Sequence, residues 1–346
     1  MKQINHLYPA FHIRKWKEQG GKVYDKRMKG DIKIRPIDSK RDFSAKRYYS
    51  LGEKDDELEQ RISFFECVIA PLIERIDSET EGVELTQQEL ELIKLYCLLC
   101  ANRHSNTCEV IKSDESGVYK SNYYFIGTHR IETQEDVVSV TAHIIDEFER
   151  VQRIPNTENR EEELPQTIKC EYSSAITKGL HLVIFRSESP IVLLSDRFCI
   201  LENTMDSDHL YSYIPVSPQT VLLLVKTKYY NNLERFDATR IGFGFEYGSG
   251  TPDEYLSDLL GAEVGFYEDR LFPAIYTDSS MTELASDGCF SLYVKIQRLP
   301  KKVFQLYNSI FCEDGEKILF CDKKELDFAL SHRLRCRDIE VVAFPF

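Results

Sequence analysis

The sequence predicts an α+β protein with a helical N-terminal half and a mainly antiparallel β C-terminal half that contains a few helices. Two observations predict this class. Up to about residue 151, apolar residues recur at steps of three and four, which is the spacing of one helix face. Beyond residue 166, short apolar runs are divided by turn residues, which is typical of strands.

Three helices are expected in the N-terminal half. The first covers residues 58–76, where Pro71 should bend or break it because proline has no backbone N–H. The second begins at Thr86, and Glu89 completes a capping box in which each side chain satisfies a free backbone N–H. The third begins with a similar pattern at Thr133.

Strands are expected mainly in the C-terminal half, with a small hairpin near the N-terminus. The expected strands cover residues 22–24, 32–34, 180–185, 191–195, 210–216, 221–227, 291–296 and 318–320. Two further helices are expected over residues 251–260 and 300–311.

A linker is expected over residues 153–166, because this stretch has two prolines, an acidic run and almost no apolar residues. It would separate two subdomains. The first, residues 1–152, contains a basic N-terminal segment and the helices. The second, residues 167–346, is rich in strands.

The composition is that of a folded protein, with 42% hydrophobic and 29% charged residues. No apolar run approaches the roughly 18 residues that a membrane helix needs, and the N-terminus has no apolar core of signal-peptide length. We therefore expect a cytoplasmic protein that does not associate with a membrane. The ten cysteines are spread thinly, which favours free thiols over disulfides.

Charge is distributed unevenly along the chain. Residues 1–50 hold 14 Lys or Arg and 5 Asp or Glu, although the whole chain has a net charge of −13. One interpretation is a basic arm that binds nucleic acid. The other is that the arm folds back on the acidic remainder. The nucleic-acid interpretation selects Arg14, Lys15, Lys17, Arg41, Lys46 and Arg47.

Several short motifs occur in a familiar order. His6 and Pro9 form a His-x-x-Pro pattern that precedes an aromatic segment, and Ser195-Asp196 closes an apolar strand. Later come an Ile-Pro-Val-Ser-Pro segment at 214–218, a helical segment at 303–308 and a strand at 317–320. Together these blocks resemble a bacterial family of proteins of unknown function.

The resemblance covers most of the chain and implies a prokaryotic or mobile-element origin, but no established chemistry. One departure concerns a candidate site. The family continues its Ser-Asp with Asn-Pro, whereas Asp196 is followed here by Arg197 and Phe198. If that proline shapes a turn at a site, the site differs in this chain.

Four residues are candidates for catalysis. His6 belongs to the opening motif, and Asp196 ends a strand, where either a catalytic acid or an ordinary turn residue is common. Arg103 offers a fork that binds phosphate, and His104 beside it offers an acid or base. Alternatively, Arg103 only complements the dipole at a helix end. Mg²⁺ is the candidate cofactor for such a site.

The pattern of Cys97, Cys100, His104 and Cys108 suggests zinc, but a continuous helix would spread these residues over roughly 16 Å. One tetrahedral ion cannot reach both ends, so a core stripe is favoured. The intervening Leu98 and Leu99 indicate burial and a raised thiol pKa.

The function stays open among three classes. No phosphate loop, nucleophile elbow, zinc-protease motif or Rossmann fingerprint is present. The first hypothesis is a nucleic-acid-directed effector, such as a nuclease-like toxin or phage-defence protein. The alternative is a non-enzymatic binding or sensing module for nucleic acid or an acidic partner protein. The third is a structural protein whose basic arm neutralises its own acidic body.

Overall fold

The computed structural model describes the greater part of the fold. The described residues are 4–6, 8–28, 33–39, 41–46, 56–103, 124–126, 129–131, 133–154, 174, 176–177, 180–196, 211–226, 279–284, 290–298, 301, 304–305, 308–309, 312 and 315–336. For some of these, including His6 and Lys46, only the backbone is described.

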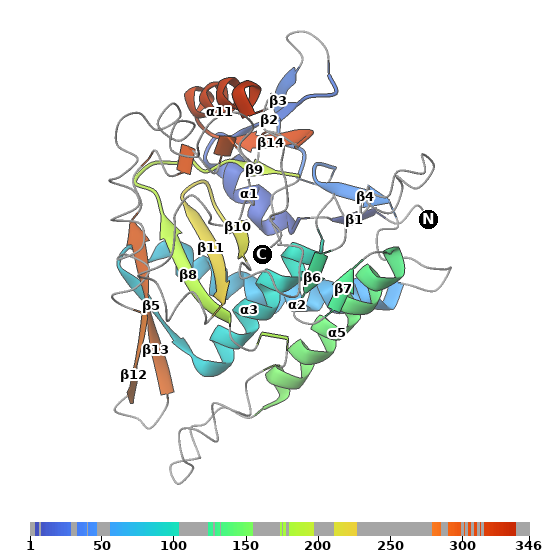
Figure 1. The fold of residues 1–346 in the computed structure, drawn as a ribbon, viewed down its shortest axis with the longest axis vertical. Coiled ribbons are helices and arrows are strands. Elements are labelled where there is room, and N and C mark those ends of the chain that lie inside the picture. Colours follow the sequence, from blue (N-terminus) through green and yellow to red (C-terminus); the bar gives the residue numbers. More distant parts are fainter. Residues whose placement is uncertain are drawn as a thin grey trace, which may run out of the picture.

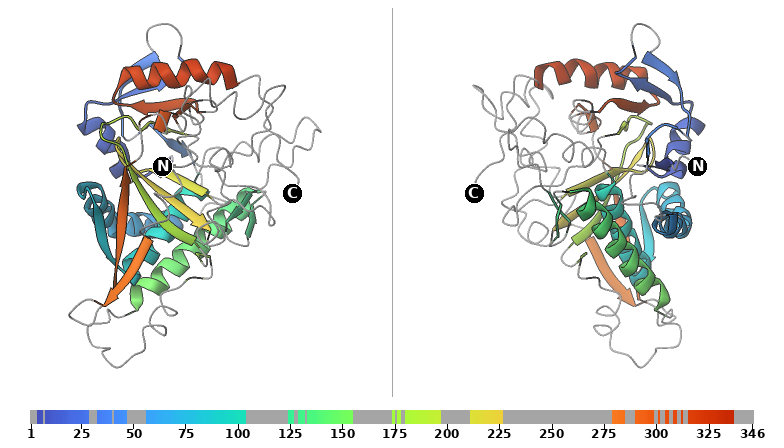
Figure 2. Two further views of the ribbon diagram at one scale, coloured as in Figure 1. Left: turned by 60° about the vertical axis from the view of Figure 1, so that its left-hand side comes forward. Right: turned by 90° about the vertical axis from the view of Figure 1, so that its right-hand side faces the viewer.

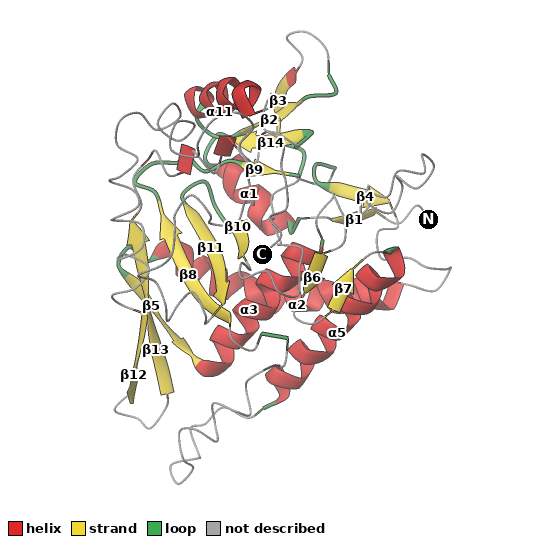
Figure 3. Cartoon of the chain, viewed as in Figure 1, coloured by secondary structure: helices red, strands yellow, loops and turns green. Residues whose placement is uncertain are grey.

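The predicted α+β class is confirmed (Figure 3). The long helices of the described chain are α1 (Ala10–Glu18), α2 (Asp56–Ser78), α3 (Gln87–Asn102), α5 (Gln134–Arg153) and α11 (Lys323–Cys336). Both predicted capping boxes are present. Thr86 exchanges hydrogen bonds with Glu89, and Thr133 exchanges them with Asp136.

A six-stranded sheet forms the centre of the molecule. Its order is β10 (Tyr211–Pro215), β11 (Thr220–Lys226), β8 (Leu180–Arg186), β13 (Phe290–Arg298) and β12 (Ser279–Leu284), with β5 (Gly82–Thr86) also paired to β13. The pairing of β8 with β13 is parallel, and the other pairings are antiparallel.

A four-stranded antiparallel sheet lies at one end of the molecule, beside α11 (Figure 1). Its order is β3 (Ile34–Pro36), β2 (Lys22–Asp25), β14 (Lys317–Phe320) and β9 (Leu194–Ser195). Two further strand pairs are β1 (Ile4–His6) with β4 (Ser44–Lys46), and β6 (Tyr124–Ile126) with β7 (His129–Ile131).

The core lies where α3 packs on the central sheet. Helix α3 contacts β5, β8, β10, β11 and β13, and α2 and α5 pack against it (Figure 1). Residues 92, 93 and 95–101 of α3 are all buried, so this helix is apolar on every side, as a central helix must be. None of the described helices is long and apolar enough to cross a membrane.

Helix α2 is continuous through Pro71, so the break that the sequence suggested does not occur. Pro71 is exposed, and its ring therefore needs no space in the core. The opposite face is held by Ile69, Ile73 and Ile76, which are fully buried. This packing stabilises the helix although one internal hydrogen bond is missing.

Strands from both predicted subdomains share sheets. β2 pairs with β14, and β5 pairs with β13. Most of the predicted linker, residues 155–166, and the predicted helix at 251–260 lie outside the described residues. Of the predicted helix at 300–311, the described residues 301, 304–305 and 308–309 are helical.

Candidate nucleic-acid interface

The basic N-terminal segment begins with α1, a helix whose two faces differ. Pro9 precedes its first turn, where proline's missing N–H costs no helical hydrogen bond. The inner face buries His12, Ile13, Lys15 and Trp16. The outer face exposes Arg14 and Lys17. Of the cations of this short helix, Lys15 is therefore buried, whereas Arg14 and Lys17 are exposed.

Three side chains attach the inner face of α1 to distant parts of the chain. The Tyr8 hydroxyl, just before the helix, donates to the carbonyl of Pro215. His12 Nδ1 lies 2.9 Å from the carbonyl oxygen of Val216. Trp16 Nε1 donates to the carbonyl of Val192 at 3.2 Å. The position of α1 is thus fixed by backbone acceptors at the end of β10, just after it, and just before β9.

His12 belongs to a buried chain of hydrogen bonds. Because the carbonyl of Val216 can only accept, Nδ1 carries the proton. Nε2 of His12 then accepts a hydrogen bond from the Tyr96 hydroxyl at 2.5 Å. Tyr96 is also hydrogen-bonded to the side chain of Cys100. Burial lowers the pKa of His12 to about 3, so the ring is neutral at physiological pH.

Lys15 is occupied inside the protein. It is buried, and its Nζ lies 2.7 Å from Asp77 Oδ2 and 3.0 Å from Glu74 Oε2. Burial acts to raise the pKa of Asp77, but hydrogen bonds from Lys15 and Ser217 and the charge of Lys15 hold that pKa low. Of the six cations that the sequence selected for nucleic acid, Lys15 thus joins α1 to α2 instead.

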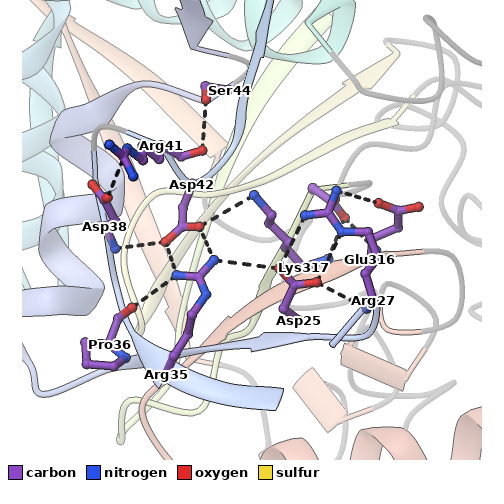
Figure 4. Close-up of polar contacts among 11 residues, drawn as sticks. Asp25, Arg27, Arg35, Pro36, Asp38, Arg41, Asp42, Ser44, Glu316 and Lys317 are labelled. Atoms are coloured by element: carbon purple, nitrogen blue, oxygen red, sulfur yellow. Dashed lines mark hydrogen bonds and ion pairs between the residues drawn. The ribbon is translucent and has the colours of Figure 1, made fainter. Parts of the chain in front are cut away.

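A second group of cations is neutralised within the β2–β3 hairpin (Figure 4). Arg27 donates to Asp25 from its backbone N–H and its guanidinium, at 3.1 to 3.3 Å. Arg35 makes a forked contact with Asp42, at 2.5 and 2.9 Å. Burial acts to raise the pKa of Asp25 and Asp42, but these arginines hold both below the ordinary value.

The same charge network reaches the C-terminal half. Lys317 Nζ lies 3.5 Å from Asp42 Oδ1, and Arg27 lies 3.4 Å from Glu316 Oε2. Lys317 is the first residue of β14 and Glu316 immediately precedes it, and Figure 4 labels both. Arg41 is different, because its side chain is 83% exposed and its nearest carboxylate, Asp38, is 3.8 Å away. The network therefore pairs Arg27 and Arg35 with carboxylates, whereas the Arg41 side chain is largely exposed to solvent.

Four other exposed cations lie on segments that meet at one end of the fold. They are Arg14, Lys17, Lys22 and Lys324. The end of α1, the start of β2 and the β14–α11 connection come together there, since Cys321 Sγ contacts the Trp16 carbonyl at 3.8 Å and Lys22 pairs with Phe320. No carboxylate in the described part of the chain forms an ion pair with any of the four.

Gly20 and Gly21 make this junction compact. Gly20 has φ of +75°, a left-handed conformation that favours glycine. A Cβ on Gly21 would lie 2.5 Å from the Trp16 carbonyl oxygen and 3.1 Å from that of Phe320. The turn can therefore bring Lys22 close behind α1 only because both positions lack a side chain.

Arg103, a candidate for catalysis, is buried at the C-cap of α3 and forms an ion pair with Glu66 of α2. This contact joins two helices through the protein interior. The sequence alone did not pair Glu66 with Arg103. The available signal was the position of this acidic residue beside the apolar stripe of α2. His104, the next residue, lies outside the described residues.

Asp196 holds β9 against β14. Its Oδ1 accepts from the backbone N–H of Glu316 at 2.8 Å and of Lys317 at 3.2 Å. Its own N–H donates to the carbonyl of Lys317 at 3.0 Å. These contacts are those of a residue that shapes a turn. For two further candidates, His6 and Lys46, the side chains are not described, and Arg47 lies outside the described residues.

The described residues contain no group of three or more His, Cys, Asp or Glu side chains suited to a metal ion. Cys97 and Cys100 are buried in α3, and Cys108 of the zinc pattern lies outside the described part. Burial raises the pKa of the Cys100 thiol to about 12. The thiol is therefore protonated and poorly suited to bind a metal, as Leu98 and Leu99 suggested.

Comparison with known families covers nearly the whole chain. The model of the family described as protein of unknown function (DUF4238) matches residues 5–325. The chain belongs to the DUF4238 family. No curated protein and no solved structure matches it.

In this DUF4238 chain, the blocks that carried the sequence resemblance lie against one another. The side chain of Asn308 donates to the Ile191 carbonyl at 2.8 Å and accepts from the Leu193 N–H at 3.0 Å. Between them lies Val192, just before β9, and its carbonyl accepts a hydrogen bond from the Trp16 indole. Trp16 and Asn308, 292 residues apart in the sequence, thus both contact residues 191–193.

Proposed function

We propose that this chain is a non-enzymatic nucleic-acid-binding module. The phosphate backbone would contact Arg14, Lys17, Lys22 and Lys324, which we call the junction cations. One observation carries the proposal: these side chains are exposed and have no described carboxylate partner, in a chain whose other described N-terminal cations are mostly paired. Exposed cations on a rigid scaffold bind phosphate at little cost in side-chain desolvation.

The nuclease-like effector is the second proposal, with a role in toxicity or phage defence. It is less well supported, because Arg103 and Asp196 are engaged in contacts within the protein. The binding proposal needs neither residue. Both proposals place the protein in the cytoplasm, and the resemblance carried by His6 and Ser195 implies a prokaryotic or mobile-element origin.

Fluorescence anisotropy with labelled single-stranded RNA and duplex DNA tests the proposal. The wild-type chain should bind more weakly as salt rises from about 50 to about 200 mM. The variant Arg14→Glu/Lys17→Glu/Lys22→Glu should lose most of this affinity, and its salt slope should fall by about 3. Lys324→Glu should lower the slope by about 1.

Arg153→Glu is the matched control. Its side chain is 78% exposed on α5, so reversing it changes the net charge by the same amount as Lys324→Glu but leaves the junction intact. Binding that is the same in the triple variant and in the control would overturn the proposal. Cleavage of either nucleic acid in Mg²⁺, abolished in Asp196→Asn, would instead support the nuclease-like effector.

A further inference from the structure

Helix α2 has a row of residues that the described structure leaves exposed, although Phe64 contacts Phe148 and Glu74 contacts Lys15. Its exposed positions recur at steps of three and four, which is the spacing of a seam between two helices. The centre of the row is apolar and consists of Phe64, Cys67 and Pro71. Acidic residues, Glu57 and Glu74, occupy the same row on either side. We call these five residues the α2 row.

Phe64 is the most informative member of the row. Its side chain is 53% exposed, the largest value among the big apolar residues of the described chain. One edge of its ring is held by Phe148 of α5, with ring centroids 6.3 Å apart. One edge of the Phe64 ring is therefore packed, and its outer face is exposed to solvent. Figure 2 shows α2 at the periphery of the helical layer. Such residues often anchor a partner.

Pro71 adds a polar feature to the same row. Because proline has no N–H, the carbonyl of Cys67, four residues earlier, loses its usual helical donor. Cys67 is itself exposed. The centre of the row therefore offers one backbone acceptor between apolar side chains.

The charge around the row is negative. α2 contains six acidic and two basic residues, and the neighbouring α5 contains five acidic and two basic residues. The acids at the ends of the row remain accessible, since the side chain of Glu74 is 73% exposed even though it contacts Lys15. Lys15 keeps its shorter contact with Asp77, so a new cation at Glu74 would leave no buried charge unpaired.

A second copy of this chain is a poor occupant. An antiparallel pairing that sets Phe64 on Cys67 of the other copy also sets Glu57 on Glu74 of that copy, at both ends. A parallel pairing sets each acid on itself. Either arrangement brings like charges together, which destabilises a helix pair. A helix with basic residues at both ends would instead be attracted to Glu57 and Glu74.

We propose that the α2 row is a docking surface for a basic amphipathic helix of a partner protein. Three apolar side chains of that helix would cover Phe64, Cys67 and Pro71, over about 10 Å. Basic side chains about 25 Å apart would reach Glu57 and Glu74. This site lies on other elements than the junction cations and does not depend on nucleic-acid binding.

A synthetic helix tests this inference with the full chain. The probe is a fluorescein-labelled peptide of about 21 residues, with three leucines at steps of three and four and lysines near both ends. A second peptide has the same composition, but its leucines are spread around the helix. The wild-type chain should bind the first peptide at least about tenfold more tightly than the second, because only the first presents a continuous apolar stripe.

Substitutions in the row locate the binding. Phe64→Ser should weaken the first complex about tenfold. Glu57→Gln/Glu74→Gln should weaken it several-fold at low salt and remove most of its salt dependence. Met28→Ser is the matched control, because Met28 is also a large exposed apolar residue but lies outside α2, at 39% exposure. It should leave the affinity unchanged.

Alkylation of Cys67 provides a second readout. Iodoacetamide modification, mapped by mass spectrometry, should slow about tenfold when the first peptide saturates the chain, because the row is then covered. Equal affinity for the two peptides, or unchanged affinity in Phe64→Ser, would overturn the proposal. A dimer detected by light scattering and lost in Phe64→Ser would overturn it in favour of a second copy.

Discussion

The hydroxyl of Tyr96 lies 2.5 Å from Nε2 of His12, deep between α3 and α1. Both residues are fully buried, and the two rings are nearly parallel. Since Nδ1 of His12 is used by the Val216 carbonyl, Tyr96 is the donor that satisfies the other ring nitrogen. Like the ion pairs of Lys15, this pair is a polar link between the basic N-terminal segment and the helices of the core.

Tyr96→Phe removes that donor and leaves a buried nitrogen without a partner. We expect the free energy of unfolding to fall by about 1–3 kcal/mol, the cost of an unsatisfied buried polar group. Urea denaturation followed by circular dichroism measures the change. Tyr24→Phe is the control, since Tyr24 is only half-buried and should change stability by less than about 0.5 kcal/mol. Equal losses in the two variants would contradict the assigned role of the Tyr96 hydroxyl.

His12 should also make stability depend on pH. Its pKa falls from 6.5 to about 3 in the folded chain because burial disfavours the charged ring. The unfolded chain then binds the proton more readily, so this contribution is complete above pH 6.5 and is lost as the pH falls toward 3. Between pH 7 and pH 5 the loss should be about 2 kcal/mol.

His12→Asn isolates this contribution, because asparagine retains a donor and an acceptor but does not titrate. Urea denaturation at pH 7 and pH 5 should show a smaller loss in the variant than in the wild type. The carboxylates of Asp25 and Asp42 do not interfere, since their pKa values are lowered and they titrate at more acid pH. An identical pH dependence in both proteins would show that His12 is not the group responsible.

Local patterns in the sequence predicted local structure well. The capping boxes at Thr86 and Thr133 depend on residues three positions apart, and both form as expected. The burial of Cys97 and Cys100 followed from the two leucines between them. The continuity of α2 through Pro71 did not follow, because it depends on packing of the opposite face against other elements.

The candidate site was harder to predict because its charges are paired over long separations. Lys15 meets Asp77, and Lys317 meets Asp42, partners 62 and 275 residues apart. An excess of positive charge in residues 1–50 does not reveal which cations are paired in this way. Helical periodicity could have predicted the burial of one cation. In α1 it places Lys15 beside the buried Trp16, and it places Arg14 and Lys17 on the outer face.

The two glycines after α1 should respond differently to alanine. Gly20→Ala meets no atom within 4 Å but forces a side chain into φ of +75°, at a cost of about 1 kcal/mol. Gly21→Ala places its Cβ 2.5 Å from the backbone oxygen of Trp16, so backbone must shift and the loss should exceed 2 kcal/mol. Thermal and urea denaturation measure both. A larger loss for Gly20→Ala would contradict this account of the junction.

Arg35 should be the most costly cation to remove from the charge network in Figure 4. Arg35→Met leaves the carboxylate of Asp42, whose side chain is only 1% exposed, with the more distant Lys317 and the Asp38 N–H. Because a buried charge is then poorly paired, we expect a loss of about 2–3 kcal/mol in urea denaturation. Arg41→Met, which removes an 83% exposed arginine from the same network, should cost less than about 0.5 kcal/mol. Adding Asp42→Asn to Arg35→Met should recover part of the loss, since the unpaired charge is gone. If the double variant instead loses more free energy of unfolding than the two single variants do together, Arg35 does not act by neutralising Asp42.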